Sequence, residues 1–419
     1  MKLFRITAAL LMTCLTLTAA GCAAPSSSTD LMAGITPAAG SALKEDDLRA
    51  ASEKTADFAV RLFRESLKDG ENTLVSPLSV LSALSMTANG AKGETLAEME
   101  AVLGLPAGDL NTAFRSLLSK PDPGDGEPRF YLANSIWFTD DERFTVNRDF
   151  LQTNADYFGA GIFRAPFDEG TRGDINRWVK DNTDGMIPEI LDQIPEEAVM
   201  YLVNALAFDG EWAEPYHEYQ VRPGDFTLAD GTKQTADFMH SGEYLYLEDG
   251  DAAAGFVKPY KGGKYAFAAL LPKEGTTVAD YAASLDGERL TKILSSAEQT
   301  LVEAALPKFE AEYGAELSEV LKAMGMPTAF DSSDADFSGL GTSTGGNIYI
   351  GRVLHKTFIA VNERGTKAGA ATVVEMMDGS AMEMPEPKRV TLDRPFVYML
   401  IDRETNQPFF IGALMTVGE

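Results

Sequence analysis

Six long apolar segments constrain the fold of this chain more than any other feature of its sequence. They are rich in β-branched and aromatic residues, which is typical of buried strands. The segments are residues 130–138, 199–208, 265–271, 301–306, 353–361 and 396–401. A doubly wound parallel sheet needs a helical segment after each strand, and these segments do not alternate with helices in that way. The pattern therefore favours an α+β fold with large sheets.

Helical periodicity predicts further elements at residues 46–68, 76–89, 109–118 and 174–180. Ser76 followed by Pro77 is typical of a helix start. The length of 419 residues would allow two or three domains. Because the sequence has no fixed-period repeat and no linker composition after Ser41, we expect one large domain over residues 46–419.

The composition limits the partners and the chemistry of the protein. Asp and Glu total 63 against 36 Lys and Arg, which gives a net charge of -27. A phosphate backbone repels such an acidic surface, so nucleic acid is not an expected partner. Two Cys are too few for a Cys-rich zinc site, and a centre with several His would need nearly all of His217, His240 and His355. We expect no metal and no cofactor.

The first 21 residues have the features of a cleaved export signal. Lys2 and Arg5 precede the uncharged apolar run of residues 6–20, which is short for a membrane span. The small residues directly before Cys22 resemble a bacterial lipoprotein cleavage box, which predicts lipidation of Cys22. The alternative is a cleaved signal followed by an incidental cysteine. We expect an exported protein that is lipid-anchored to a bacterial cell membrane or cell surface, or extracellular.

The segment that follows Cys22 has linker composition. Residues 23–41 are rich in Ala, Ser, Pro, Gly and Thr. About 20 such residues span roughly 25 Å on average, enough to hold a domain off a membrane. We therefore expect residues 22–45 to form a lipidated Cys and a flexible linker.

Two short stretches match motifs of enzyme active sites or metal sites only weakly. Residues 341–345 read Gly-Thr-Ser-Thr-Gly, but a nucleophile elbow needs a strand before it and a helix after it, and the order here is inverted. Asp331, Asp334 and Asp336 do not have the spacing of an EF-hand calcium loop. Both stretches are better interpreted as loops, and we do not expect an enzyme.

A run of small residues near the C-terminus has the alternation of a strand. From Glu363 to Thr372 hardly any side chain is large. The side chains of one parity are small or apolar, and charged residues lie on the other face, which is typical of a half-buried strand. The first set is Thr366, Ala368, Ala370, Thr372, Val374 and Met376. The alternative is a flexible Ala/Gly linker, but a sequence that suits both loop and strand suggests a conformational switch.

At this point the chain resembles the serpin family. The small-residue run is similar to the serpin hinge, and four further stretches match the family in order along the chain. They are residues 72–80, 90–95, 203–212 and 392–398. The resemblance implies large mixed or antiparallel β-sheets with about eight or nine helices, and an exposed reactive-centre loop at about residues 363–390. It also implies a monomer.

The resemblance implies inhibition of serine proteases by a suicide-substrate mechanism. The target protease attacks the exposed loop and forms an acyl-enzyme. The cut loop then inserts into the main sheet as a new strand, and the trapped protease is distorted. About ten inserted residues with ladder hydrogen bonds on both sides, at ~1 kcal/mol net for each bond, would contribute on the order of 10–20 kcal/mol. This rivals the usual stability of a domain, about 5–15 kcal/mol, so the uncut fold is predicted to be metastable.

The resemblance implies which bond is cut, because the serpin hinge begins at a Glu seventeen places before the cleaved bond. Sixteen residues beyond Glu363 the count reaches Gly379, so the predicted bond joins Gly379 to Ser380. Met377 and Met382 are the rival sites. No Lys or Arg lies between residues 367 and 388, which disfavours trypsin-like targets and favours elastase-, subtilisin- or chymotrypsin-like proteases.

Other residues match structural positions of the family. The implied hinge comprises Glu363, Gly365, Thr366, Ala368, Ala370 and Thr372. Ser76, Ser79, Asn204 and His355 match the shutter, a polar cluster where the strands of the main sheet part, and Trp212 matches the breach, where insertion begins. The alternative function is a non-inhibitory serpin that acts as a binding or chaperone-like module, which usually carries bulky or charged inward hinge residues. The small hinge residues here favour inhibition.

Overall fold

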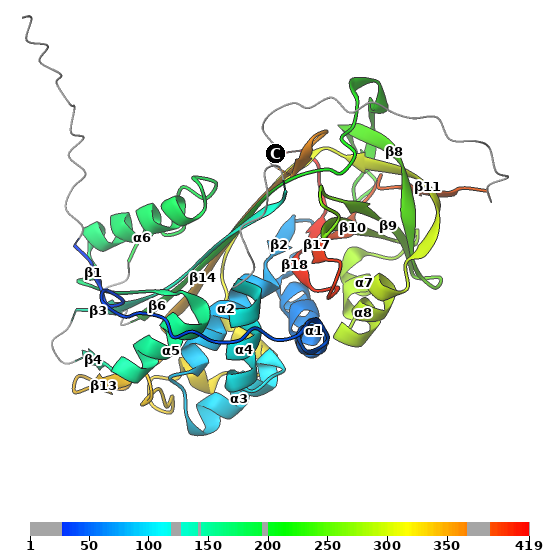
Figure 1. Cartoon of the computed structure of the whole chain (residues 1–419). Helices are drawn as coiled ribbons and strands as arrows, with labels where there is room; N and C mark the ends of the chain where they lie inside the picture. The colour runs from blue at the N-terminus through cyan, green and yellow to red at the C-terminus, as the bar shows by residue number, and fades with distance from the viewer. Residues whose placement is uncertain (1–26, 119–126, 141–143, 195–199, 367–385, 419) are drawn as a thin grey trace, which may run out of the picture.

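The computed structural model describes residues 27–118, 127–140, 144–194, 200–366 and 386–418, and it has an α+β architecture (Figure 1). The helices of these stretches are α1 (Glu45–Ser66), α2 (Pro77–Ala88), α3 (Gly93–Leu103), α4 (Ala107–Leu118), α5 (Arg148–Phe158), α6 (Glu169–Asn182), α7 (Val278–Ala283), α8 (Gly287–Ser295) and α9 (Ser318–Met324). Two short 3-10 helices are η1 (Glu218–Gln220) and η2 (Thr328–Phe330).

One of the two large sheets has seven strands. Its strands, in spatial order, are β1 (Thr29–Asp30), β5 (Gly161–Ala165), β3 (Arg129–Thr139), β6 (Met200–Glu211), β15 (Gly365–Thr366), β14 (Arg352–Val361) and β12 (Phe309–Glu316). The sheet is mixed, because β3 and β6 are antiparallel whereas β6 and β14 are parallel. The two central strands β6 and β14 thus come from segments about 150 residues apart.

The second large sheet carries the C-terminal strands. Its order is β16 (Lys388–Thr391), β11 (Glu298–Pro307), β8 (Lys233–Asp249), β9 (Ala253–Pro259), β10 (Tyr265–Pro272), β17 (Phe396–Asp402), β18 (Pro408–Leu414) and β2 (Thr73–Val75), with β7 (Val221–Thr227) paired to β8. A small ribbon pairs β13 (Gly341–Ser343) with β4 (Phe144–Val146). Every residue of β17 and β18 is buried, so these strands form part of the main core.

Helices cover both faces of the seven-stranded sheet. Helix α2 begins at Pro77 behind the N-cap Ser76, whose side chain accepts from the backbone N–H of Ser79, and all twelve of its residues are buried. Helix α6 lies on the opposite face of the sheet (Figure 1). There its Ile175 and Val179 pack in a second, smaller hydrophobic cluster. The sheet is therefore buried on both faces.

The predicted α+β class is confirmed, and so are the helices and strands expected from periodicity. The short segment Gly341–Ser343 was expected to be a loop, and that is wrong: it is the strand β13. Its backbone pairs with β4 from Phe144 to Val146, a partner that local sequence does not reveal. No helix of the described residues is both long enough and apolar enough to cross a membrane.

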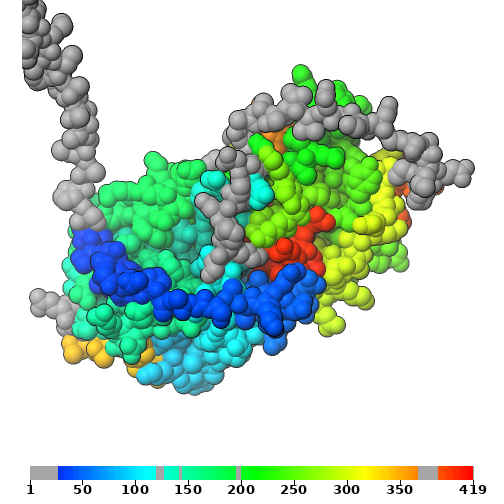
Figure 2. Space-filling model, viewed as in Figure 1, coloured from blue at the N-terminus to red at the C-terminus, as the bar shows by residue number. Residues whose placement is uncertain are grey.

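Residues 27–43, expected to belong to a flexible linker, lie against the body of the protein. They cross its surface as a continuous band (Figure 2). Strand β1 pairs with β5 at the edge of the sheet, and the backbone N–H of Leu31 donates to the carbonyl of Ile162 at 2.8 Å. Further along, the N–H of Ala38 donates to Asp156 at 2.7 Å. Backbone pairing and side-chain acceptors hold this segment, and composition alone could not predict either.

Candidate functional site: the hinge and the opening of the main sheet

The predicted hinge enters the seven-stranded sheet at one end. Strand β15 pairs antiparallel with β6, with Gly365 opposite Glu211 and Thr366 opposite Gly210. On its other side, Thr366 pairs with Val361 at the end of β14. Two residues of the hinge therefore already occupy the position between the two central strands.

Beyond these two residues the central strands pair directly with each other. The parallel register runs from Arg352 opposite Tyr201 to Phe358 opposite Ala207. A strand that continued from Thr366 in the same direction would have to separate these pairs and replace them with its own hydrogen bonds. The geometry is that of a sheet opened at one end and closed along the rest of its length.

Gly365 is required by a close backbone approach. A Cβ atom at this position would lie 2.0 Å from the carbonyl oxygen of Gly210 and 2.9 Å from the Cα atom of Glu211. Both neighbours are backbone atoms of β6, which cannot move aside as a flexible side chain can. A larger residue would therefore displace β15 from β6.

Glu363 fixes the hinge to Lys308, which lies between β11 and β12. Its carboxylate lies 2.7 Å from Nζ of Lys308, and its carbonyl accepts from the N–H of Tyr216 at 2.8 Å. Burial alone would raise the pKa of this carboxyl, but the hydrogen bond and charge of Lys308 outweigh it and the pKa is lowered. Glu363 is thus held ionised and paired at the start of the hinge.

Trp212 lies directly beside the hinge. Its indole Nε1 donates to the carbonyl of Asn362 at 2.8 Å, and its backbone N–H donates to the carbonyl of Arg364 at 2.8 Å. The ring stacks on Tyr260, with centroids 4.5 Å apart. The structure thus places Trp212 where the hinge enters the sheet, next to a tyrosine that the sequence did not single out.

Thr366 is fully buried and hydrogen-bonded. Its hydroxyl lies 2.5 Å from the hydroxyl of Tyr260, which is also fully buried. Burial raises the pKa of Tyr260 well above its usual value, although the hydrogen bond to Thr366 acts in the opposite direction. The phenol therefore stays protonated over any physiological pH.

The structure brings the four predicted shutter residues together beneath the central strands. The N–H of Ser76 donates to Nε2 of His355 at 3.0 Å. Nε2 is therefore the acceptor, and Nδ1 carries the proton toward Oδ1 of Asn204, 2.5 Å away. Ser79 completes the group through its N–H, which donates to Oγ of Ser76 at 3.2 Å. The cluster links helix α2 to both β6 and β14.

Asn134 belongs to the same cluster and was missed from the sequence. Its Oδ1 accepts from Nδ2 of Asn204 at 3.1 Å and from Oγ of Ser79 at 3.5 Å, which extends the cluster to β3. Asn134 is one of few polar residues in an otherwise apolar strand. Because buried polar groups are nearly always paired, this position could have signalled a polar partner inside the core.

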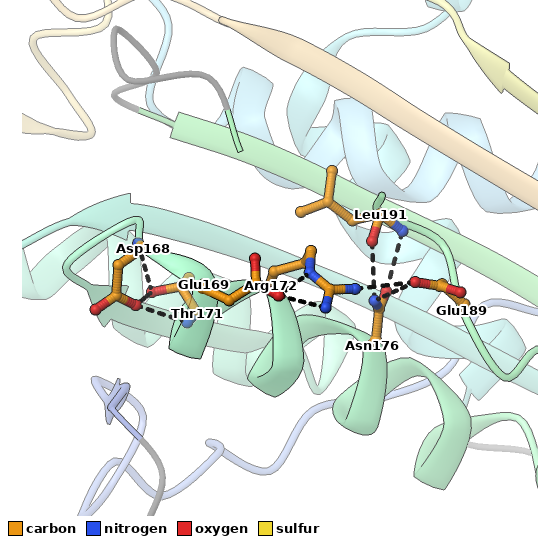
Figure 3. A network of polar contacts seen from close by, with 7 residues as sticks. All are labelled: Asp168, Glu169, Thr171, Arg172, Asn176, Glu189 and Leu191. Carbon is orange, nitrogen blue, oxygen red and sulfur yellow. Dashed lines mark hydrogen bonds and ion pairs between the residues drawn. The ribbon is translucent and has the colours of Figure 1, made fainter. Parts of the chain in front are cut away.

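Helix α6 packs on the sheet by its apolar face and makes polar contacts with the segment that follows it (Figure 3). Oδ1 of Asn176 accepts from the N–H groups of Ile190 and Leu191, each at 3.0 Å. Arg172 donates to Glu189 at 3.0 Å and pairs with Glu169. Helix α6 is thus tied to residues 189–191, which follow it in the sequence.

Several predicted site residues lie outside the described residues. They are Cys22, Ala368, Ala370, Thr372, Met377, Gly379, Ser380 and Met382. Within the described stretches, no three His, Cys, Asp or Glu side chains are grouped so that they could hold a metal ion. The site that the structure defines is the junction of the hinge, β6 and β14.

Comparisons with known proteins agree with this geometry. The family model described as Serpin (serine protease inhibitor) matches residues 53–417. The chain belongs to the serpin family. It is 45% identical to tengpin, a thermophilic serpin whose native-state crystal structure superposes with a TM-score of 0.86 and covers 93% of this chain and 99% of that one.

Two sequence relatives show how widely the family extends. An uncharacterised serpin-like protein of Thermococcus kodakarensis is 32% identical over 381 residues, 89% of this chain and 87% of the relative. The leukocyte elastase inhibitor of Equus caballus is 31% identical over 383 residues, 86% of this chain and 98% of the relative. At the level of the family, the chain is a member of a group made up mostly of protease inhibitors rather than enzymes.

Proposed function

We propose that this protein inhibits serine proteases as a suicide substrate. One observation carries the proposal: Thr366 is fully buried between β6 and β14, and its small side chain fills the first position that an inserted strand would occupy. A loop that continues from this position needs no new entry point into the sheet. The partner is the target protease, held in a covalent acyl complex by the monomeric inhibitor.

The chemistry is supplied by the protease. Its serine hydroxyl adds to the carbonyl carbon of Gly379, and the bond between Gly379 and Ser380 breaks, with the released amine of Ser380 taking up a proton. The product is an ester between the protease and the Gly379 carbonyl. If the loop inserts before water hydrolyses this ester, the protease is trapped; if hydrolysis comes first, the inhibitor is consumed as a substrate.

The target class follows from the residues around the bond. Gly379, Ser380 and the rival positions Met377 and Met382 are small or apolar and uncharged. They suit the primary pockets of elastase-, subtilisin- or chymotrypsin-like proteases, and the name of the equine relative, leukocyte elastase inhibitor, is in keeping with an elastase-like target.

The site of action is proposed to be outside the cytoplasm. Residues 1–21 are the export signal, and Cys22 is the lipid-carrying residue that anchors the protein to a bacterial membrane or cell surface. An extracellular protein without an anchor is the alternative if Cys22 is not acylated.

Incubation with an elastase-like, a subtilisin-like and a chymotrypsin-like protease tests the function. An SDS-resistant complex is expected at the mass of the protease plus the inhibitor without its C-terminal fragment, and mass spectrometry of the released fragment should give Ser380 as its first residue. Cleavage by all three proteases without any complex would favour the alternative, a non-inhibitory serpin that acts as a binding or chaperone-like module. A fragment that begins after Met377 or Met382 would move the reactive bond and leave the mechanism intact.

A further inference from the structure

Tyr260 is the residue outside the hinge whose side chain holds the inserted hinge residue. It follows β9 directly and lies 106 residues from Thr366 in the sequence. Its ring is fixed between aromatic neighbours: it stacks on Trp212 at 4.5 Å with an interplanar angle of 13°, and it meets Phe208 edge-on at 4.8 Å. A ring packed in this way has no freedom to turn its hydroxyl elsewhere.

The two hydroxyl groups depend on each other. Tyr260 and Thr366 are each fully buried, and their 2.5 Å contact is the one hydrogen bond that the described structure gives to either hydroxyl. If Thr366 left the sheet, Tyr260 would keep a buried hydroxyl without a partner, which is a costly state. The bond therefore favours the inserted position of Thr366 over the expelled one.

Apart from the ion pair of Glu363 with Lys308, the other contacts that hold the hinge use its backbone. The N–H groups of Trp212 and Tyr216 donate to the carbonyls of Arg364 and Glu363, each at 2.8 Å. Backbone bonds of this kind form with almost any hinge sequence. The bond from Tyr260 forms only with a hydroxyl at position 366, so it is the contact that recognises this particular residue.

We propose that Tyr260 is a positioning residue for loop insertion: its hydroxyl keeps Thr366 in the first inserted position, so that insertion after cleavage continues from a strand already begun. This inference rests on the proposed inhibitory function. Trapping depends on insertion being faster than hydrolysis of the acyl-enzyme. If the hinge first has to re-enter the sheet, insertion is slower relative to hydrolysis. More inhibitor is then consumed as substrate for each protease that is trapped.

The stoichiometry of inhibition tests the role of the hydroxyl. One buried hydrogen bond corresponds to about a five-fold change in an equilibrium constant. Tyr260→Phe and Thr366→Val are each expected to raise the moles of inhibitor consumed per protease by roughly three- to five-fold. The stoichiometry of inhibition of the double variant should be no higher than that of either single variant, because the double variant leaves no hydroxyl unpaired. Thr366→Ser keeps a hydroxyl, so its stoichiometry should equal that of the wild-type protein.

A matched control separates positioning from general stability. Tyr281 is also buried, and its hydroxyl donates to Asp249 at 3.0 Å, but it lies in α7 away from the hinge. Tyr281→Phe should lower the melting temperature by about as much as Tyr260→Phe and leave the stoichiometry of inhibition unchanged. Equal increases in stoichiometry for both variants would overturn the proposal.

Amide hydrogen exchange of the uncut protein gives a second readout that needs no protease. The amides of Trp212 and Tyr216 donate to hinge carbonyls, so their exchange reports release of the hinge. Tyr260→Phe should speed their exchange by roughly three- to five-fold, whereas Tyr281→Phe should not. Unchanged exchange in Tyr260→Phe refutes the positioning role. If the wild-type protein traps no protease while this exchange difference is present, the proposed function fails and the hold of Tyr260 on the hinge stands.

Discussion

Nδ1 of His355 and Oδ1 of Asn204 lie 2.5 Å apart, and they join β14 to β6 at the middle of their shared register. These are the two strands that an inserting loop would separate. The same imidazole accepts from the backbone N–H of Ser76 at the start of α2. One neutral histidine therefore connects both central strands to the helix beneath them, and its protonation would break the connection to Ser76.

The free energy of unfolding should decrease as the pH is lowered, because His355 is buried in its neutral form. Its complete burial lowers its pKa to about 3, whereas an unfolded histidine has a pKa near 6.5. The unfolded chain thus binds a proton that the folded chain excludes. The contribution is complete above pH 6.5 and is lost as the pH falls toward 3, by at most about 1.4 kcal/mol per pH unit.

The measurement is urea unfolding at pH 7 and pH 5 of the wild-type protein and of His355→Gln. The loss of unfolding free energy between the two pH values should be smaller in the variant by about 2 kcal/mol. An identical loss in both proteins would show that this histidine does not exclude the proton.

Thr366→Arg should convert the inhibitor into a substrate. The position is fully buried, and an unpaired guanidinium there has no partner to offset its desolvation. The hinge would leave the sheet, and cleavage would no longer lead to insertion. Gel analysis should show cleaved protein and no SDS-resistant complex, whereas Thr366→Ser keeps the complex; complex formation by the arginine variant at the wild-type level would contradict insertion at this position.

Disruption of the Lys308–Glu363 pair should loosen the hinge with little loss of stability. Both side chains are about one-third exposed, so the pair is expected to contribute no more than about 1 kcal/mol. Glu363→Lys should speed amide exchange at Tyr216, and adding Lys308→Glu should restore it. Glu319→Lys, which disrupts the surface pair with Lys322, serves as the control and should leave Tyr216 unaffected.

Asp174 should determine whether the N-terminal segment stays on α6. Its Oδ2 accepts from the backbone N–H of both Ser27 and Ser28, at 2.9 and 3.1 Å, and from their hydroxyls. Asp174→Ala removes these acceptors, so the amides of residues 27–31 should lose protection from exchange. Asp181→Ala, on an exposed part of the same helix, should not change them. If the amides of residues 27–31 stay protected in Asp174→Ala, the pairing of β1 with β5 is sufficient to hold the segment in place.

Cys22→Ser should release the exported protein from membranes. Lipidation requires the thiol, and the substitution removes it while changing little else. Fractionation of expressing bacterial cells should find the wild-type protein in the membrane pellet and the variant in the soluble fraction. Cys14→Ser is the matched control, because Cys14 lies inside the apolar signal run. A variant that still sediments with membranes would refute an anchor at Cys22.

The elements that could be predicted from the sequence are those whose own residues have a clear pattern of a helix or a strand. The run Val353–Val361 is apolar enough to be a central strand in any sheet, and it is the core of β14. In contrast, β8 has a polar, partly exposed pattern over residues 233–249 and was not predicted. It is stabilised by pairing with β9, which follows it directly, and with β11, which is distant in the sequence.

For the site, the sequence by itself determined the residue types that insertion requires. The small side chains from Gly365 onward and the alternation through Thr366 were visible in one short segment, because period-2 patterning is a local property. Matches to family stretches then gave the shutter residues and Trp212. Apart from the shutter cluster that the resemblance implied, the sequence did not reveal the contacts that join distant segments.

Only the tertiary structure decided which groups meet. Tyr260 and Thr366 are 106 residues apart, Asn134 reaches Asn204 across 70 residues, and Ser27 reaches Asp174 across 147. Such contacts depend on strand register and on the packing of the whole core, which no local pattern encodes. The sequence determined that this chain carries an insertable hinge; the fold determined that two of its residues are already in the sheet, and which side chain holds them there.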